Sequence, residues 1–243
     1  MEVVLETIGL TRHFGQVTAA DSVSVHVRMG EWVSIVGPNG AGKTTFLNLV
    51  TGYVKPERGQ ILYMGNDITG LPPRDVTRLG IARSFQVPQL YTDLTVMENV
   101  LIALAAQAGC GLDFWNSLRR DGWLASALET LNHFGLRRYA NRPAKELPEG
   151  GRKLLDIALA FALRPQLLLM DEPTSGVSRQ EKFDVMDTLV EVLRPTDVTT
   201  LFVEHDMDIV RQYAQRVLVF HEGRLIADGD PQVVLAGVDN LPS

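Results

Sequence analysis

The stretch GPNGAGKT, Gly37 to Thr44, has the composition of a loop that binds phosphate groups. It lies between an apolar run that predicts a buried strand, Glu31 to Val36, and a helical pattern. Glycines allow successive N–H groups to wrap phosphate oxygens, Lys43 can reach the β- and γ-phosphates, and the Thr44 hydroxyl can bind Mg²⁺. The sequence thus predicts a nucleotide phosphate site made of Gly37, Pro38, Asn39, Gly40, Ala41, Gly42, Lys43, Thr44 and Thr45.

An apolar run that ends in two carboxylates, LLLMDEP, occupies Leu167 to Pro173. It predicts a buried strand, and ligands of open parallel sheets bind at the carboxyl ends of strands, where both acids would face the phosphates. Asp171 could then hold Mg²⁺, directly or through water. Glu172 would be free to orient or deprotonate a water molecule that attacks the γ-phosphate. The alternative is a strand end with two solvated acids.

Two further polar residues follow predicted strands: Gln86 in SFQVPQLYTDLTVMENV and His205 in LFVEHDMDIV. A lone Gln or His is most often structural. Both nonetheless fall on the edge that would carry Lys43 and Glu172 in a parallel sheet. Gln86 could there sense Mg²⁺ and the attacking water, and His205 could form a hydrogen bond to the γ-phosphate.

A glycine-led helix start, ELPEGGRKLLDIALA at residues 146–160, has features both for and against an anion site. Gly150 and Gly151 precede apolar residues at helical spacing, and the free N–H groups and dipole of a helix start favour an anion. Pro148 lacks an N–H donor, however, and Glu149 carries a negative charge. Taken alone, the stretch is compatible with an anion site or with a plain loop.

The composition limits the class of protein. A chain of 243 residues can form one large domain or a core with one subdomain. The net charge of −6 argues against a protein held to nucleic acid by a positive field. The N-terminus lacks a basic segment followed by an apolar run, and the longest charge-free stretch, Asn99 to Leu112, is shorter than the roughly twenty residues of a membrane helix. We therefore expect a soluble chain that reaches a membrane only through a partner.

Alternating strand and helix patterns predict an α/β fold with a mostly parallel sheet covered on both faces. An N-terminal antiparallel β portion is expected to include Val3 to Ile8 and the alternating residues Val23 to Val27. The sequence pattern changes at about residue 88, where the alternation of strands and helices gives way to helical segments. We predict one domain, 1–243, in which 1–87 and about 142–243 form the α/β core and about 88–141 form a helical insert.

Two helices are predicted in this insert. Thr95 to Glu98 fits a capping box that opens a helix through Ala108, which Gly109 and Gly111 end. A second helical pattern, roughly Leu124 to Phe134, is followed by Gly135.

The order of these motifs resembles the nucleotide-binding subunit of an ABC transporter, from the phosphate loop through Gln86 and the glycine-containing helix start to DEP and His205. The resemblance covers essentially the whole chain. It implies a P-loop nucleotide hydrolase core, ATP and Mg²⁺ as cofactors, and ATP hydrolysis at the interface of a dimer. The implied catalytic residues are Glu172, His205 and Gln86, and the implied magnesium residues are Thr44, Gln86 and Asp171.

The resemblance also gives a role to the helix start. LPEGG stands where the family has its signature, usually LSGGQ, which contacts the ATP held by the second subunit. Phe14 fits the aromatic residue that stacks on adenine. SGVS, after DEP, fits the dimer-contact loop, although Ser178 stands where an acid or amide is common. The implied signature residues are Leu147, Pro148, Glu149, Gly150 and Gly151.

The signature departs from the family pattern. Pro148 offers no hydroxyl or N–H to a phosphate, and Glu149 places a carboxylate near a polyanion unless it points away. Arg152 and Lys153 follow in the first turn of the helix. Either they offset the anionic charge, or they pair with Glu146 or Glu149 at the surface. We expect an impaired site, and hence a second ATPase subunit of different sequence, with a homodimer as the alternative.

The implied partners are this second ATP-binding subunit, two transmembrane permease subunits and, for an importer, a substrate-binding protein. They would place the chain on the cytoplasmic face of the inner membrane, without nucleic acid. The pattern is closest to importers of branched-chain or other hydrophobic amino acids. Urea-type importers and a lipopolysaccharide-export ATPase share it. A regulatory ATP sensor with impaired hydrolysis and a soluble P-loop kinase are more distant alternatives.

Overall fold

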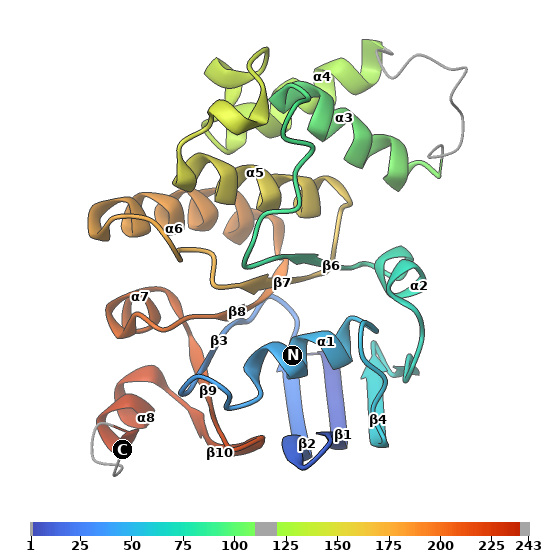
Figure 1. Ribbon diagram of the computed structural model, residues 1–243, viewed down its shortest axis with the longest axis vertical. Helices are drawn as coiled ribbons and strands as arrows, with labels where there is room; N and C mark the ends of the chain where they lie inside the picture. Colours follow the sequence, from blue (N-terminus) through green and yellow to red (C-terminus); the bar gives the residue numbers. More distant parts are fainter. Residues whose placement is uncertain (1, 110–120, 239–243) are drawn as a thin grey trace.

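The computed structural model describes residues 2–109 and 121–238, which form two β-sheets and the helices around them (Figure 1). The smaller sheet is N-terminal and antiparallel, as predicted, with the strand order β2-β1-β4-β5. Its first two strands continue well past the predicted limits, because they form a long hairpin that turns at Gly15, where φ is +62°. The strands are β1 (Val3–Phe14), β2 (Val17–Arg28), β4 (Arg58–Tyr63) and β5 (Asn66–Asp67).

The larger sheet has the order β10-β9-β3-β8-β7-β6. All its neighbouring strands pair in parallel except β10 and β9. The prediction of a mostly parallel sheet is therefore confirmed. The strands are β3 (Trp32–Val36), β6 (Ile81–Ser84), β7 (Leu167–Asp171), β8 (Thr199–Val203), β9 (Arg216–His221) and β10 (Arg224–Gly229).

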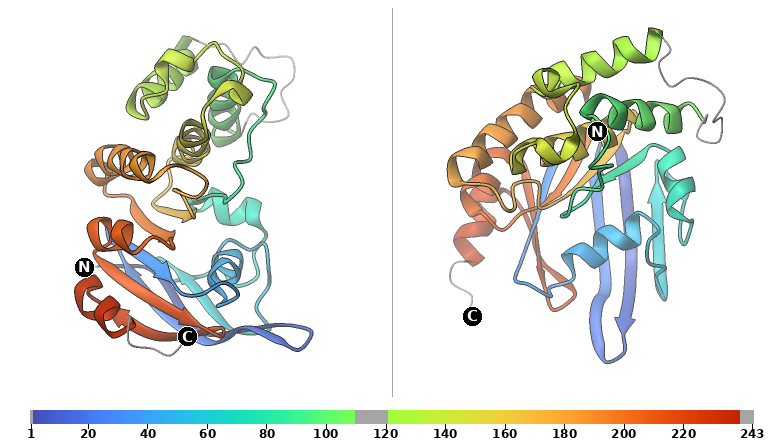
Figure 2. Two further views of the ribbon diagram at one scale, coloured as in Figure 1. Left: turned by 60° about the vertical axis from the view of Figure 1, so that its left-hand side comes forward. Right: turned by 45° about the horizontal axis from the view of Figure 1, so that its top comes forward.

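The central parallel strands of the larger sheet, β3, β7 and β8, are buried on both faces, which explains their apolar runs. In β7, Leu167 and Leu169 belong to the core around α1 (Lys43–Val50) and the N-terminal sheet. Leu168 and Met170 belong to the core on the other face, with α5 (Glu149–Ala162) and α6 (Arg179–Leu193). Figure 2 shows these layers from two further sides. The alternation follows from the two-residue period of a strand.

Helices α3 (Val96–Gln107) and α4 (Asp121–His133) lie beyond α5, farthest from the sheets (Figure 1). The predicted capping box is present, since the Thr95 hydroxyl accepts from Glu98 N and the Glu98 carboxylate accepts from Thr95 N. Gly109 and Gly135 follow the two helices with φ of +73° and +67°, and the predicted contribution of Gly111 lies outside the described residues. The limits of the helical insert stay a prediction.

The remaining helices are short, and α7 (Met207–Tyr213) and α8 (Pro231–Val238) pack against β3 and β9 of the larger sheet. No helix within residues 2–109 and 121–238 combines the length and apolar character needed to cross a bilayer. The remaining elements are α2 (Pro73–Arg78) and the 3₁₀ turns Arg137–Tyr139, Ala144–Glu146 and Arg194–Thr196.

Removal of the Thr95 cap tests how far it stabilises α3. We expect Thr95→Ala to lower the free energy of unfolding by about 1 kcal/mol, because two backbone N–H groups at the helix start lose or loosen their partners. The measurement is urea unfolding at neutral pH. Thr92→Ala is the matched control, since Thr92 is exposed and its hydroxyl forms no bond to the described residues. Equal stability of the two variants would show that the cap is dispensable.

Candidate functional site

The phosphate loop follows β3 and leads into α1, as predicted, and two of its glycines cannot be replaced without strain. Gly37 has φ of +149°, and a Cβ there would lie 2.1 Å from Phe220 O. Gly42 has φ of +99°, and its Cβ would lie 2.2 Å from Ala19 O. The loop is thus pressed against β9 and β2, and only glycine fits both positions.

Lys43 begins α1, and its side chain turns back across the loop. Its Nζ donates to Gly37 O at 2.7 Å and to Pro38 O at 2.8 Å. Burial lowers the pKa of Lys43, whereas attraction to Glu172 and Asp171 opposes that shift. The ammonium thus lies near the two carboxylates predicted to share its site. Around it, Ala41 is buried, Thr45 is half-buried, and Asn39, Gly40 and Thr44 are exposed.

Asp171 ends β7 and forms a buried ion pair that the sequence did not reveal. Its Oδ2 accepts from Arg83 Nη2 on β6 at 2.8 Å, and both side chains are at most 5% exposed. Arg83 also donates to Asn48 Oδ1 on α1 at 2.6 Å. The other carboxylate oxygen, Oδ1, is buried and has no partner among the described residues. An unpaired anionic oxygen beside a phosphate loop fits a Mg²⁺ ion or one of its water ligands.

The three predicted catalytic side chains meet at Glu172. Its Oε2 accepts from Gln86 Nε2 at 2.8 Å, and its Oε1 lies 2.8 Å from His205 Nε2. These residues follow β7, β6 and β8, so parallel pairing brings their carboxyl ends to one edge. Glu172 itself has φ of +51°, a conformation that is uncommon for a residue with a side chain.

A buried glutamate beside this cluster was missed by the sequence analysis. Glu204 is 3% exposed, and its Oε1 accepts from the N–H and hydroxyl groups of Thr174 at 3.1 and 2.7 Å. Its Oε2 accepts from His205 N at 3.2 Å. Burial raises the pKa of the Glu204 carboxyl, although these hydrogen bonds act in the opposite direction. Glu204 therefore ties the segment after Glu172 to the segment that carries His205.

Phe14 lies near the turn of the β1–β2 hairpin and is 46% exposed. The Arg12 guanidinium lies 5.0 Å from the centre of its ring and occupies one face. Phe14 pairs with Val17, and the nearby Ala19 carbonyl faces the phosphate loop at Gly42. The ring is thus on the sheet that borders the phosphate loop, and no described contact joins the two.

The predicted signature stretch forms the start of α5, with Pro148 as the N-cap. Leu147 is buried, and a Cβ on Gly150 would lie 3.5 Å from Val185 on α6. The backbone N–H groups of residues 149–151 have no partner among the described residues, as is usual for a first turn. Gly151 is half-buried, and Pro148 is exposed.

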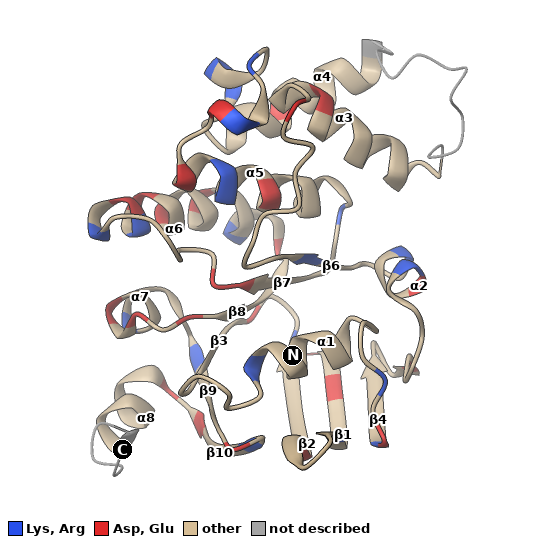
Figure 3. Ribbon diagram, in the orientation of Figure 1, with Lys and Arg blue, Asp and Glu red and all other residues tan. Residues whose placement is uncertain are grey.

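The two cations after this stretch behave differently. Arg152 pairs with Glu149, which is the predicted pairing at the surface. For Lys153 the surface pairing was wrong, because its side chain is buried and its ammonium contacts backbone oxygens. Figure 3 shows the acidic and basic segments that follow one another along α5. Ser178 forms a capping box with Glu181 at the start of α6, which the spacing Ser178 to Glu181 could have indicated.

Comparison with known proteins agrees with the family resemblance seen in the order of the sequence motifs. Residues 20–175 match the protein family described as ABC transporter. The chain is also 34% identical over 238 residues to a protein of Escherichia coli (strain K12), the high-affinity branched-chain amino acid transport ATP-binding protein LivG. That match covers 95% of this chain and 93% of the relative.

Two solved structures are similar along nearly the whole chain. The ADP conformation of MJ1267, an ATP-binding cassette of an ABC transporter, has a TM-score of 0.86 and 30% identity, covering 97% of this chain and 96% of that one. The dimeric post-hydrolysis state of the ATP-binding cassette MJ0796, bound to ADP and Pi, has a TM-score of 0.79 and 25% identity, covering 93% and 98%.

The buried pair of Arg83 and Asp171 generates a test of the site's architecture. We expect Arg83→Met to lower the free energy of unfolding by about 3–5 kcal/mol, because a buried carboxylate would lose its countercharge. The double variant Arg83→Met with Asp171→Asn should recover much of this loss, since no charge is left unpaired. Urea unfolding of the two variants and the wild type measures the difference. A single variant within about 1 kcal/mol of the wild type would mean that water screens the pair.

Proposed function

We propose that this chain, which belongs to the ABC transporter family, hydrolyses Mg-ATP with Glu172 and thereby drives the transport of branched-chain or other hydrophobic amino acids. Its family membership makes it an ATP-binding and ATP-hydrolysing motor subunit. The assignment of roles to residues rests on one observation: Gln86, Glu172 and His205 are joined by hydrogen bonds at the same sheet edge as Lys43.

ATP binding would use the phosphate loop and α1. Lys43 would exchange its bonds to Gly37 O and Pro38 O for the β- and γ-phosphates, while the loop N–H groups hold phosphate oxygens. Phe14 would offer adenine the ring face that Arg12 does not cover. Thr44, Asp171 and Gln86 would hold Mg²⁺. The ion would neutralise charge on the phosphates and orient them.

Hydrolysis needs a water molecule that is positioned and deprotonated beside the γ-phosphate. Glu172 is the proposed general base, and its backbone lies in the left-handed region directly after β7. Gln86 and His205 each contact one carboxylate oxygen of Glu172. A carboxylate has about four lone-pair sites, so Glu172 can accept a proton from water while these contacts remain. On ATP binding, His205 could instead turn to donate to the γ-phosphate, and Gln86 to the water.

A dimer would complete each site. The relative MJ0796 is described as a dimeric cassette bound to ADP and Pi. In our proposal, the start of α5 reaches the ATP held by a second ATPase subunit, and residues 149–151 offer their N–H groups to the γ-phosphate. Arg152 neutralises Glu149, so the main defect of this signature is the missing hydroxyl at Pro148. A second subunit with an intact signature would serve the Lys43 site.

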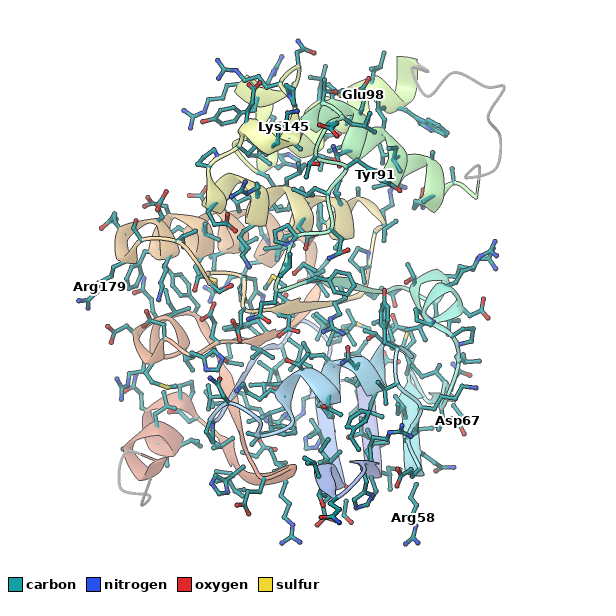
Figure 4. All side chains as sticks on the ribbon, in the orientation of Figure 1. Arg58, Asp67, Tyr91, Glu98, Lys145 and Arg179 are labelled. Atoms are coloured by element: carbon teal, nitrogen blue, oxygen red, sulfur yellow. The ribbon has the colours of Figure 1, made fainter. Side chains whose placement is uncertain are left out.

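The transported substrate is inferred from the relative LivG, whose name specifies branched-chain amino acids. Two permease subunits would hold the chain at the cytoplasmic face of the cell membrane. We place their contact near Tyr91, which is 58% exposed, and the ion pair of Asp93 with Lys145. Figure 4 shows Tyr91, Glu98 and Lys145 close to one another beside α3. Glu98 is less suited to this contact, because its carboxylate caps α3.

The proposal is tested in the intact transporter complex by Glu172→Gln. We expect ATP affinity to be retained and turnover to fall by about 100-fold or more, because the amide keeps the shape of the side chain but cannot act as a base. Mg²⁺-dependent phosphate release and equilibrium ATP binding measure the two quantities.

The matched control is Glu191→Gln. Glu191 is exposed and lies near the end of α6, which leads to the start of β8, whereas the candidate site lies at the carboxyl ends of the strands. Lys43→Ala should instead weaken ATP binding itself. Undiminished turnover in Glu172→Gln would remove Glu172 from the role of base, and normal ATP affinity in Lys43→Ala would refute the phosphate-loop assignment.

The missing hydroxyl of the signature can be restored. Pro148 has φ of −61° and ψ of 164°, the extended conformation of a helix N-cap, so a serine fits there without strain. In a complex that carries Glu172→Gln, the remaining turnover reports the opposite site. We expect Pro148→Ser to raise it about tenfold, since a hydrogen bond to a charged group contributes about 1.5–3 kcal/mol and about 1.4 kcal/mol is tenfold in rate.

Pro148→Ala is the control, because it restores the backbone N–H without the hydroxyl. Phosphate release in the complex is the measurement for both variants. An equal rise in Ser and Ala variants would assign the defect to the N–H group. A Glu172→Gln complex that keeps half of the wild-type turnover would contradict unequal sites.

A further inference from the structure

Two buried charges on α5 have no part in the site described above. Lys153 and Asp156 are one helical turn apart, and they are 3% and 5% exposed. Charged side chains are rarely buried to this extent unless they are paired or hydrogen-bonded. Each of them forms its hydrogen bonds with loops of the candidate site and not with a neighbouring helix.

Lys153 is bonded to two separate loops. Its Nζ donates to Gln86 O, to Glu172 O at 3.3 Å and to Ser175 Oγ at 2.9 Å. An ammonium group has three N–H donors, so these acceptors match its capacity. The first acceptor belongs to the loop after β6, and the other two belong to the loop after β7. Burial lowers the pKa of Lys153, although four nearby carboxylates attract its charge.

Asp156 holds the same β6 loop from the next turn. Its Oδ2 accepts from Phe85 N and its Oδ1 accepts from Gln89 N, both at 2.8 Å. Gln86 lies between these two residues. Together with the Lys153 bond, three backbone groups around Gln86 are fixed to one face of α5.

The helix that carries these charges starts with the signature stretch. Residues 149–151 lie in the first turn of α5, and Lys153 follows directly after that turn. An α-helix moves as a rigid unit over one or two turns. A displacement at the start of α5 therefore moves Gln86 and the Glu172 backbone, unless the bonds to Lys153 and Asp156 break.

From this geometry we infer that Lys153, supported by Asp156, is a positioning residue that couples the signature stretch to Gln86 and Glu172 of the same chain. The inference rests on the proposed function. Contact of α5 with ATP at the opposite site would set the position of the base and of Gln86 at this chain's own site. Hydrolysis at one site would thus depend on the nucleotide at the other.

The decisive experiment is Lys153→Met in the full transporter complex, with steady-state ATP hydrolysis and equilibrium ATP binding as readouts. Methionine keeps a similar volume and removes all three donors. We expect kcat to fall about tenfold or more, because the base and Gln86 lose their alignment. ATP affinity at the Lys43 site should stay within about twofold, and the Hill coefficient for ATP should fall to about 1.

Tyr213→Phe is the matched control. It removes a buried hydrogen bond to Asp187 at 2.7 Å between α7 and α6, away from the loops that Lys153 holds. It should lower stability without changing kcat or the Hill coefficient. If the complex with Lys153→Met fails to assemble, Lys153→Arg is used in its place. The planar guanidinium keeps the positive charge but cannot point its N–H donors in the three directions of an ammonium group. We expect that variant to lose at least about threefold in kcat and most of the cooperativity.

The outcomes separate the two proposals. A wild-type complex without ATP hydrolysis, or an active Glu172→Gln complex, would refute the proposed function. An active wild type whose Lys153 variant keeps both kcat and Hill coefficient would overturn this inference alone. A wild-type Hill coefficient of about 1 would overturn it as well, since no dependence between the sites would remain to be transmitted.

Discussion

The parallel pairing of β6, β7, β8 and β3 is the constraint on which the candidate site depends. It brings Gln86, Glu172, His205 and the phosphate loop to one edge, although they are spread over most of the chain. Parallel strands are stable only when both faces are covered, so the edge exists because α1 fills one side and α5 and α6 the other. The site is thus a by-product of burying the strands.

The sequence predicted those parts of the fold and site that depend on local patterns. Glycine spacing predicted the loop between β3 and α1, and the apolar run before Asp171 predicted its strand. The capping box at Thr95 predicted the start of α3 within one residue. Such features are set by interactions between residues that are neighbours in the chain, and they can be recognised without knowing the tertiary structure. The roles of the individual site residues remain proposals.

Other parts of the site could not be predicted because they arise only when distant segments meet. Arg83 reads as one polar residue in a strand, and its pairing with Asp171 requires that β6 and β7 be neighbours. Lys153 follows Arg152 and looks like the second of two exposed cations. It is buried because the Gln86 loop closes over that face of α5. Glu204 is hidden for the same reason, since its partner Thr174 follows another strand.

The departures in the predicted signature are easier to understand once α5 is considered as a structural member as well as a proposed phosphate contact. A carboxylate in the first turn stabilises an isolated helix through its dipole, and the same charge opposes an incoming phosphate. Glu149 is therefore favourable for the fold and unfavourable for the ligand, and its pairing with Arg152 reduces both effects. Lys153, one residue further, points inward and gives its three N–H donors to the loops, so it attracts Glu149 through space and forms no hydrogen bond with it. At the start of α5, Arg152 thus pairs with the charge of Glu149, whereas Lys153 holds the backbone at Gln86 and Glu172.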